Sequence, residues 1–333
     1  MPLIFDTVYG NIDVNPNDFK FIDNMWVKRL KRINQLGLLE HVFPSASHSR
    51  FEHSLGVYHI AGKYIDILEN KSKKKLFTKK EKQCVMLAGL FHDLGHGPFS
   101  HVFDNILFKI NSKNTINDHE TRSKHIVEKI FKEVQPKNFN GYDIDLIKNL
   151  INPSSELFTN TMEGYYNVEK PYLFEIINNK INNIDVDKFD YLQRDSKHLG
   201  LESNFDPGRI MNKSYVCHER KRLIYDISLQ NNIFDLFYTR YKFHKDIYNH
   251  KTVKMCELML LDSLSNLSKE CLNIEDYCKI IDGTLSDQFL ELDDSIYNKI
   301  LFSKEEKLNT SKHLLKRIEE RDLYKCLNIE EIS

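Results

Sequence analysis

The sequence predicts a mostly helical fold with short β-hairpins. Apolar residues recur at intervals of three and four along most of the chain, which is typical of buried helix faces. Only two segments alternate in the way that strands do, and 12 glycines and 8 prolines in 333 residues leave no obvious flexible linker. We therefore expect one domain over residues 1–333, with a core of about 20–267 and a helical extension of about 268–333.

The elements follow in order along the chain. A first strand-like segment, "LIFDTVYGNIDV", covers residues 3–14, and a second hairpin is expected over Tyr215–Ser228 with its turn at "HERKR". The first helix is predicted on the face formed by Phe19, Ile22, Trp26, Leu30 and Ile33, after the start signal "NPND". The helix at 80–94 is apolar nearly all round, which is typical of a central helix. Predicted helices cover residues 19–33, 51–68, 80–94, 119–135, 142–151, 170–196 and 229–267, with shorter pieces to the end.

Composition excludes several classes of protein. Lys plus Arg (47) nearly cancels Asp plus Glu (48), so no global basic field supports nucleic-acid binding. The six cysteines contain no C-x-x-C pair, and the longest apolar run, residues 84–91, is far shorter than the roughly 20 residues of a membrane helix. We expect a soluble, intracellular, cytoplasmic protein, with the nucleus not excluded, and no membrane partner. The sequence also has no phosphate-binding G-x-x-x-x-G-K-[ST] loop.

The stretch "HDLGHGPFSH" follows the apolar run "CVMLAGLF" and delivers His92 and Asp93 to the end of a buried helix. Imidazole and carboxylate together suit iron, manganese or zinc. Two ligands hold a metal weakly, so partners are needed, and "RFEHSLG" offers His53 while "NIDVDKFDYLQRD" offers Asp187. A lone histidine on an apolar face is more often a hydrogen-bonded core residue. Two histidines and two aspartates would instead leave open positions, as a catalytic metal site requires.

Seven segments in this order carry a resemblance to a known family: "RINQLG", "VFPSASHSRFEHSLGV", "AGLFHDLGHGPFSHVFD", "DHE", "IDVDKFDYLQRDSKHLG", "NFD" and "FYTRYKFHKDIYNHK". The chain resembles the HD-domain deoxynucleoside triphosphate (dNTP) triphosphohydrolases, most closely the metazoan branch with a sterile-alpha-motif domain ahead of the HD domain. The likeness runs from about Ile4 to Lys325. It implies the helical HD-domain phosphohydrolase fold and a divalent metal (iron, manganese, zinc or magnesium), with a second magnesium ion accompanying the substrate. The implied metal ligands are His53, His92, Asp93 and Asp187.

The resemblance also implies a reaction, in which metal-activated water attacks the α phosphorus and releases deoxynucleoside and intact triphosphate. A bound metal can lower the pKa of its water from 15.7 to about 7. His96, His101 and His119 are all candidates to protonate the leaving oxygen, because imidazole titrates near neutrality. By resemblance His101 is the general acid, Asp104 and His119 orient it or the second metal, and His96 touches the α phosphate.

Two polar stripes predict the substrate contacts. On a helix, Asp187, Tyr191 and Asp195 share one face, and Arg240, His244, Tyr248 and Lys251 recur at spacings of four, four and three. Such a stripe is usually an exposed charged face, but the aromatic residues between the cations favour binding of phosphate together with packing on a sugar. The resemblance assigns Arg50, Lys188, Tyr191 and Arg240 to the triphosphate and Asp195 to the 3'-hydroxyl. Gln35, Leu36 and Tyr248 would contact the sugar, with His244 in the same substrate-binding set, and Leu36 and Tyr248 would crowd the 2' position. We therefore expect a preference for deoxyribose and acceptance of several dNTPs.

The resemblance breaks at the regulatory sites. The metazoan enzymes are assembled into tetramers by nucleotides, and this chain keeps Asp23 of a guanine pocket but has Lys28 and Lys31 in place of a glutamine and an arginine. Two further positions that are basic in the metazoan enzymes are Asp226 and Ser228 in this chain. A neighbouring dNTP effector pocket is better matched, although Asp6 and Asp246 add carboxylates that would repel a triphosphate. Its matching residues are Val42, Phe43, Arg209, His250, Lys251 and Arg321.

We expect constitutive activity or a simpler control in a homo-oligomer, a dimer or tetramer, since the chain ends at Ser333 without a further C-terminal lobe and has no sterile-alpha-motif domain. Two alternatives stay open. One is an HD phosphohydrolase acting on another nucleotide phosphate ester, and the other is a nucleotide-sensing or nucleic-acid-binding module with weak catalysis. The cations at Arg50, Lys188 and Arg240 exceed what one phosphate needs and favour a triphosphate.

Overall fold

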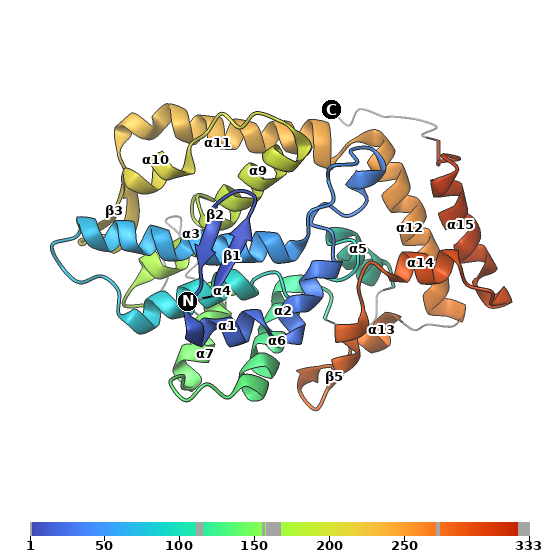
Figure 1. The fold of residues 1–333 in the computed structure, drawn as a ribbon, viewed down its shortest axis with the longest axis horizontal. Helices are drawn as coiled ribbons and strands as arrows, with labels where there is room; N and C mark the ends of the chain where they lie inside the picture. Colours follow the sequence, from blue (N-terminus) through green and yellow to red (C-terminus); the bar gives the residue numbers. More distant parts are fainter. Residues whose placement is uncertain (1, 111–115, 155–156, 158–167, 271–273, 326–333) are drawn as a thin grey trace. The chain divides into compact units, whose positions relative to one another are not determined.

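The computed structural model describes residues 2–110, 116–154, 157, 168–270 and 274–325 (Figure 1). The chain divides into two compact units. The first comprises Met1–Lys31, His48–Gly95 and Asp118–Lys242, and the second comprises Arg32–Ser47, His96–Asn117 and Phe243–Ser333. Both are mostly helical, and the strands among the described residues form two-stranded antiparallel sheets, which confirms the expected fold class. The single domain expected from the sequence stays a prediction.

The first unit is built around α3 and α4. Helix α4 packs against α3, α7 and α8, and α9 packs against α3. Cys84, Val85, Leu87, Leu90 and Phe91 of α4 have no exposed surface, which confirms the central helix expected from its composition. The elements of this unit are β1 (Leu3–Asp6), β2 (Gly10–Asp13), α1 (Pro16–Ile22), α2 (Met25–Arg29), α3 (Arg50–Lys71), α4 (Lys79–Phe91), α6 (His119–Val134), α7 (Gly141–Ile151), α8 (Phe174–Ile177), α9 (Val186–Leu199), α10 (Pro207–Asn212), β3 (Ser214–Cys217), β4 (Arg222–Tyr225) and α11 (Gln230–Phe243).

Capping side chains fix the starts of these helices. The Thr78 hydroxyl accepts the backbone N–H of Glu81, and the Glu81 carboxylate accepts the backbone N–H of Thr78, which is a capping box at the start of α4. Asp185 caps α9 by accepting the backbone N–H of Lys188. Helix α4 ends at His92, its C-cap residue. The buried helix therefore holds His92 and Asp93 at its C-terminal end.

The second unit contains the helices on either side of "HGPFSH" and the C-terminal helices. Helix α12 packs against α5 and α15, and α14 packs against α15. The sequence patterns missed α5 and the small hairpin β5–β6. The elements are α5 (His101–Ile110), α12 (Lys251–Glu270), α13 (Ile274–Tyr277), β5 (Ile280–Ile281), β6 (Thr284–Leu285), α14 (Ile296–Leu301) and α15 (Asn309–Glu319).

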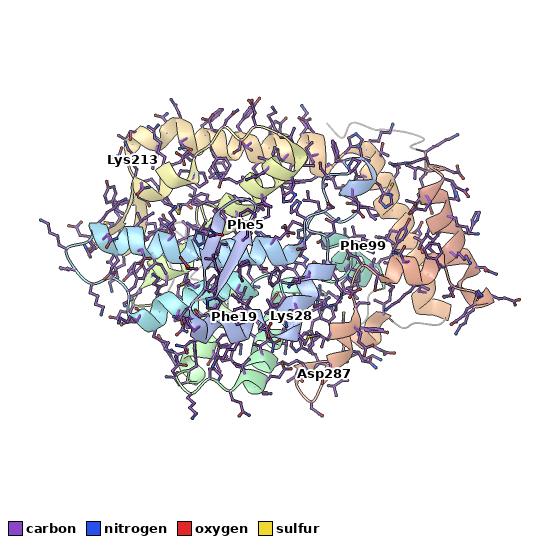
Figure 2. All side chains as sticks on the ribbon, in the orientation of Figure 1. Phe5, Phe19, Lys28, Phe99, Lys213 and Asp287 are labelled. Atoms are coloured by element: carbon purple, nitrogen blue, oxygen red, sulfur yellow. The ribbon has the colours of Figure 1, made fainter. Side chains whose placement is uncertain are left out.

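Most predicted elements are present, but three predicted helices are wrong as single helices. The helix expected at 19–33 stops at Ile22 and restarts at Met25, because the Asn24 side chain accepts the backbone N–H of Trp26 and caps α2. Phe19, labelled in Figure 2, was expected on the buried face and is 38% exposed. Both predicted hairpins are confirmed, with Leu3 paired to Asp13 and Ser214 paired to Tyr225.

The other two helices break for similar local reasons. Between α8 and α9 the Asn179 side chain accepts the backbone N–H of Ile181 and holds the chain in a loop. The helix expected at 229–267 ends at Phe243, passes through a π-helical turn at His244–Tyr248 and restarts at Lys251. The Asn249 amide donates to the His244 carbonyl at 2.7 Å. Among the described residues, no helix combines the length and the apolar character needed to cross a membrane.

Candidate active site

Three segments of the first unit bring together the four side chains that were expected to bind a metal. His53 lies on α3, His92 and Asp93 follow α4, and Asp187 lies in the first turn of α9. The two Nε2 atoms of His53 and His92 are 3.2 Å apart, and Asp187 Oδ1 lies 3.1 Å from His53 Nε2 and 3.5 Å from His92 Nε2. The Asp93 oxygens lie 3.6 Å from His53 Nε2 and 3.4 Å from His92 Nε2. The structure thus brings together the four residues expected as ligands.

Neighbouring groups aim both imidazoles at the same point. His53 Nδ1 lies 2.7 Å from the Asp190 carboxylate, and His92 Nδ1 lies 2.7 Å from the carbonyl oxygen of Gly89. Since both partners only accept, each Nδ1 carries a proton and each Nε2 faces the other expected ligands. Two deprotonated Nε2 atoms beside carboxylates repel unless a proton or a metal ion lies among them. The donor atoms of His53, His92 and Asp187 lie within 4.8 Å of one another, and this combination of imidazole and carboxylate suits a divalent ion such as iron, manganese or zinc.

The electrostatics of the cluster also favour a cation. Burial opposes the charged form of His53, but hydrogen bonds to Asp187 and Asp190 outweigh it and raise its pKa to about 10. For His92, burial is likewise outweighed by Asp93 and Asp187, which raise its pKa. Burial would raise the pKa of Asp187, yet the two imidazoles lower it strongly. The carboxylates therefore attract positive charge, and a metal ion can take the place of the protons.

Cationic side chains of the first unit surround this cluster. Arg50 is 3% exposed, and its Nη1 donates to Asp93 Oδ2 at 2.5 Å, so in this structure it orients a metal ligand. Lys188 donates to Asp185 at 2.9 Å and is 8% exposed. Arg240 is half-buried, and its buried Nε has no hydrogen-bond partner in the part of the chain that the structure describes. A buried N–H of this kind fits an anionic ligand, because an unsatisfied donor is costly.

The predicted stripe on α9 is confirmed as one helix. Burial and the negative charge of Asp187 raise the pKa of Tyr191, so its phenol stays a neutral donor. Arg240 is close enough to Tyr191 and Lys188 for its charge to act on the pKa of both groups, against the net rise that each shows. The last member, Asp195, is buried, and its Oδ1 lies 2.8 Å from His48 Nε2.

His48 is a residue that sequence reasoning missed. It is 2% exposed, and its ring stacks on His198 with the ring centroids 4.3 Å apart. It lies in the loop before α3, where no periodic pattern marks it. Asp190 and Arg194 were also missed, although their i, i+4 spacing on the predicted helix was a usable signal.

In the second unit, the donor atoms of His96, His101 and Asp104 lie within 4.8 Å of one another. The His96 and His101 rings are nearly perpendicular, with centroids 4.9 Å apart. His96 is buried and His101 is exposed at the first position of α5. His119 begins α6 in the first unit, where its carbonyl oxygen lies 2.0 Å from the position that a Cβ on Gly95 would take.

The chain just before His101 is strained and is held by the C-terminal segment of the same unit. Phe99 and Ser100 have φ values of 58° and 60°, in the left-handed region that non-glycine residues rarely adopt. Asp294 accepts the backbone N–H of Phe99 at 2.7 Å and that of Asn34 at 2.7 Å. The Ser100 hydroxyl donates to the Asn34 carbonyl at 2.6 Å. Asp294, which the sequence analysis did not single out, therefore joins the "RINQLG" loop to the His101 loop.

The remaining expected substrate residues also belong to the second unit. Gln35 is 9% exposed and Leu36 is half-buried in the loop that Asp294 holds. His244 and Tyr248 lie in the π-helical turn, with ring centroids 5.1 Å apart. The stripe expected on one long helix therefore runs across a break, with Arg240 on α11 and Lys251 at the start of α12.

The residues expected at the guanine pocket are engaged locally. Lys28 forms an ion pair with Asp23 at 2.6 Å, and the Lys31 ammonium lies 4.6 Å from the centroid of the Phe51 ring. Asp226 accepts the backbone N–H of Ser228. These contacts leave the retained Asp23 paired within the chain.

The residues expected at the dNTP effector pocket fall in both units. In the second unit the Phe43 and His250 rings meet at 5.6 Å, Arg321 donates to the carbonyl of His41, next to Val42, and Lys251 is exposed. In the first unit Arg209 is exposed. Asp6, expected to repel a triphosphate, is 4% exposed and is paired with Arg194. The expected repulsion by Asp6 stays a prediction.

Comparison with known proteins gives independent information on the same segments. The HD domain profile matches residues 50–195. The chain is 36% identical over 98% of its length to the deoxynucleoside triphosphate triphosphohydrolase SAMHD1 homolog of Dictyostelium discoideum, and 34% identical over 98% of its length to human deoxynucleoside triphosphate triphosphohydrolase SAMHD1. It is 37% identical over 84% of its length to the putative HD domain-containing protein L394 of Acanthamoeba polyphaga mimivirus. The chain covers 60%, 54% and 62% of these three proteins.

Proposed function

We propose that the chain, in which residues 50–195 match the HD domain profile, is a metal-dependent triphosphohydrolase that converts a dNTP into deoxynucleoside and triphosphate. The observation that carries the proposal is the cluster of His53, His92 and Asp187, whose donor atoms lie within 4.8 Å of one another, with the Asp93 oxygens 3.6 and 3.4 Å from the two imidazoles. The buried Nε of Arg240, which has no hydrogen-bond partner among the described residues, supports an anionic substrate.

The four ligands His53, His92, Asp93 and Asp187 would hold the ion, and iron, manganese, zinc and magnesium are the candidates. Such an ion supplies an activated water for attack on the α phosphorus. Arg50 keeps Asp93 in place through its guanidinium, and Asp190 keeps the Nε2 lone pair of His53 directed inward. A second magnesium ion would accompany the triphosphate.

Lys188, Arg240 and Tyr191 would bind the triphosphate, with Arg50 adding a further positive charge. Burial opposes the charged form of Lys188, but Asp185 and Asp187 outweigh both burial and Arg240 and raise its pKa, so Lys188 is a cation. A triphosphate could use the charges of Lys188, Arg240 and Arg50 together, whereas a monophosphate would use only part of them. The cationic group therefore favours a triphosphate over a monophosphate or cyclic nucleotide.

His101 would donate a proton to the 5'-oxygen as the bond between this oxygen and the α phosphorus breaks. Its exposure at the first position of α5 leaves its ring accessible to substrate. His96 would touch the α phosphate, and Asp104 and His119 would orient the acid or the second ion. The products then balance as a neutral deoxynucleoside hydroxyl and a triphosphate that carries the oxygen of water.

For the sugar, we propose Asp195 as the acceptor of the 3'-hydroxyl, held by His48. Gln35, Leu36, His244 and Tyr248 complete the substrate-binding set. Leu36 and Tyr248 would exclude a 2'-hydroxyl, which gives the preference for deoxyribose. An intracellular, cytoplasmic setting is part of the proposal, since nucleoside triphosphates are intracellular metabolites.

Product analysis tests the proposal. Purified protein with Mn²⁺ and dATP should yield deoxyadenosine and tripolyphosphate, and ATP should react far more slowly. Release of orthophosphate or pyrophosphate would favour a phosphohydrolase of a different phosphate ester. Binding of dATP without turnover would favour a nucleotide-sensing module.

A ligand variant tests the site itself. Asp93→Asn should abolish metal-supported turnover while the circular dichroism spectrum stays that of the folded protein. Asp66→Asn is the matched control, because Asp66 lies on the exposed face of α3 and pairs only with Lys82 at the surface in the described contacts. An Asp93→Asn protein with unaltered rates would contradict the ligand assignment.

A further inference from the structure

A buried chain of charged groups connects the N-terminal hairpin β1–β2 to the metal-binding histidine His53. We propose that Asp6 is a positioning residue for the metal centre, acting through Arg194 and Asp190 on the orientation of His53. The inference rests on the proposed function only in that the four ligands hold a divalent ion. It assigns to the N-terminal hairpin a part in metal binding.

The chain begins at the imidazole. Asp190 Oδ2 accepts the proton of His53 Nδ1 at 2.7 Å, and this contact fixes which nitrogen of His53 faces Asp187 and His92. Asp190 is fully buried, and its Oδ2 accepts from both His53 Nδ1 and Arg194 Nε. Its direction toward His53 is therefore fixed by the groups packed around it.

Arg194 fixes the carboxylate in turn. Its Nε donates to Asp190 Oδ2 at 2.8 Å and its Nη2 donates to Asp190 Oδ1 at 2.9 Å, which is a two-pronged contact with a defined plane. The guanidinium is fully buried. Its remaining Nη1 donates to Asp6 Oδ2 at 2.9 Å. The plane of Arg194 is thus set by two carboxylates, one on each side.

Asp6 is anchored by the hairpin turn. Its Oδ1 accepts the backbone N–H groups of Val8 at 2.8 Å and Tyr9 at 2.9 Å, and it is itself 4% exposed at the end of β1. The Arg194 guanidinium lies 5.9 Å from the centroid of the Tyr9 ring, on the same turn. The turn therefore holds the Asp6 carboxylate rigidly, and Asp6 transmits its position to Arg194.

Helix α3 leaves room for this network at one position. A Cβ on Gly56, one turn after His53, would lie 1.9 Å from Asp190 Oδ1 and 2.4 Å from Arg194 Nη2. The ion pair therefore lies directly against the backbone of the helix that carries His53. Because groups that orient a metal-bound imidazole typically change metal affinity by about 10- to 100-fold when they are removed, the network bears on metal binding as well as on folding.

The experiment measures Mn²⁺ binding by isothermal titration to metal-free protein, with no nucleotide present. Asp190→Asn should raise the dissociation constant about 10-fold or more, and Asp6→Asn should raise it by about 3- to 10-fold. Asp13→Asn is the matched control, since it removes an exposed carboxylate from the other strand of the same hairpin and should leave the dissociation constant unchanged. Circular dichroism confirms that each variant is folded.

An Asp6→Asn protein that is folded and binds Mn²⁺ as tightly as the parent would overturn the role of Asp6. An Asp190→Asn protein with unchanged Mn²⁺ affinity would overturn the whole network. Should Asp6→Asn not fold, Arg194→Lys serves instead: it keeps the charge but cannot contact Asp6 and both Asp190 oxygens together, and it should weaken Mn²⁺ binding in the same way. The proposed reaction can fail independently. In that case Mn²⁺ would bind the parent and the variants with the expected differences in affinity, but the parent would not release tripolyphosphate from dATP.

Discussion

His53 shows how a single side chain is given one chemical state. The ring is 1% exposed, its Nδ1 is hydrogen-bonded to Asp190, and its Nε2 faces Asp187. An imidazole in water would exchange between tautomers and orientations. Packing and one hydrogen bond remove that freedom before any ion binds, so less conformational entropy is lost on binding.

Gly56→Ala tests how closely this arrangement is packed. A methyl group at this position would overlap Asp190 and Arg194, so we expect a loss of about 2–4 kcal/mol in the free energy of unfolding and weaker Mn²⁺ binding. Urea unfolding and Mn²⁺ titration measure the two effects.

Gly62→Ala is the control on the same helix. Its Cβ would meet only the flexible side chain of Met86, at 2.8 Å, which can move aside. Equal losses in the two variants would show that Gly56 is required for general helix packing and not for the ion pair.

Glu175 gives the structure a pH dependence that is independent of the metal ligands. Burial raises its pKa to about 7, although Arg222, 3.4 Å away, acts in the opposite direction. The folded protein therefore binds more protons than the unfolded chain between about pH 4.5 and 7, and its stability falls as the pH rises through this range. The full loss, about 3 kcal/mol, is reached above pH 7.

Glu175→Gln should remove this loss. The amide does not ionise, so the variant keeps the stability that the parent loses as the pH rises. The difference in the free energy of unfolding, variant minus parent, should therefore be about 3 kcal/mol larger at pH 8 than at pH 4. Urea unfolding at both values measures the change, and Glu202→Gln, at an exposed glutamate, controls for the removal of a charge. A pH-independent difference between Glu175→Gln and the parent would contradict the assignment.

At the scale of single residues, the sequence predicted that His53, His92, Asp93 and Asp187 lie together, but it did not predict the residues that hold them in place. His92 and Asp93 could be found because a polar pair ends an apolar helix, and His53 and Asp187 because motifs surround them. His48 contacts Asp195, which is 147 residues away in the chain, and Asp294 contacts Phe99, which is 195 residues away. No local pattern encodes such contacts, since they arise only when the segments fold together.

At the scale of elements, the structure uses helix ends for its chemistry. His92 is the C-cap of α4, Asp187 lies in the first turn of α9, and His101 is the first residue of α5. Side chains at helix ends lie beside loops and can face a ligand, while the helix interior supplies the packing. The periodic patterns predicted α3, α4, α6 and α7 within a few residues. They failed where asparagine side chains interrupt a continuous apolar face, at Asn24, Asn179 and Asn249.

Asp294→Ala tests the loop that carries His101. The two backbone N–H groups of Phe99 and Asn34 would lose their acceptor, and the left-handed Phe99 and Ser100 would lose the contact that holds them in place. We expect kcat for dATP hydrolysis to fall about 10-fold or more, because small displacements of a catalytic group are costly.

Mn²⁺ affinity should stay unchanged in this variant, since the four ligands belong to the first unit. Asp322→Ala, which removes an exposed ion pair with Arg317 in the second unit, is the control and should have normal kcat. A fall in Mn²⁺ affinity with normal kcat would contradict the role given to Asp294.

At the scale of the whole molecule, the residues at the expected regulatory sites depart further from the family's residues than those at the expected catalytic site do. Lys28 pairs with Asp23, and Lys31 lies over the Phe51 ring, so both altered positions have partners inside the first unit. A nucleotide base that contacted Asp23 Oδ1 would have to compete with Lys28. The homo-oligomer expected from the resemblance stays a prediction.

We therefore expect no activation by GTP. The rate of dATP hydrolysis at a fixed Mn²⁺ concentration should be the same with and without GTP, and size-exclusion chromatography should show the same elution volume in both conditions. A rate that rises several-fold with GTP, or an assembly that forms only in its presence, would contradict this expectation. Lys28→Gln, which frees Asp23, is the variant in which a response to GTP would be sought.

The anchoring of Asp6 has a practical consequence for how the protein is prepared. Shortening the amino terminus to start after Gly10 would remove a short, seemingly dispensable ribbon together with the one carboxylate that meets Arg194 Nη1 in the described contacts. The Nη1 group of Arg194 would then lose its carboxylate acceptor and Arg194 would orient Asp190 less firmly, so protein shortened in this way should be purified with less bound metal than the full chain.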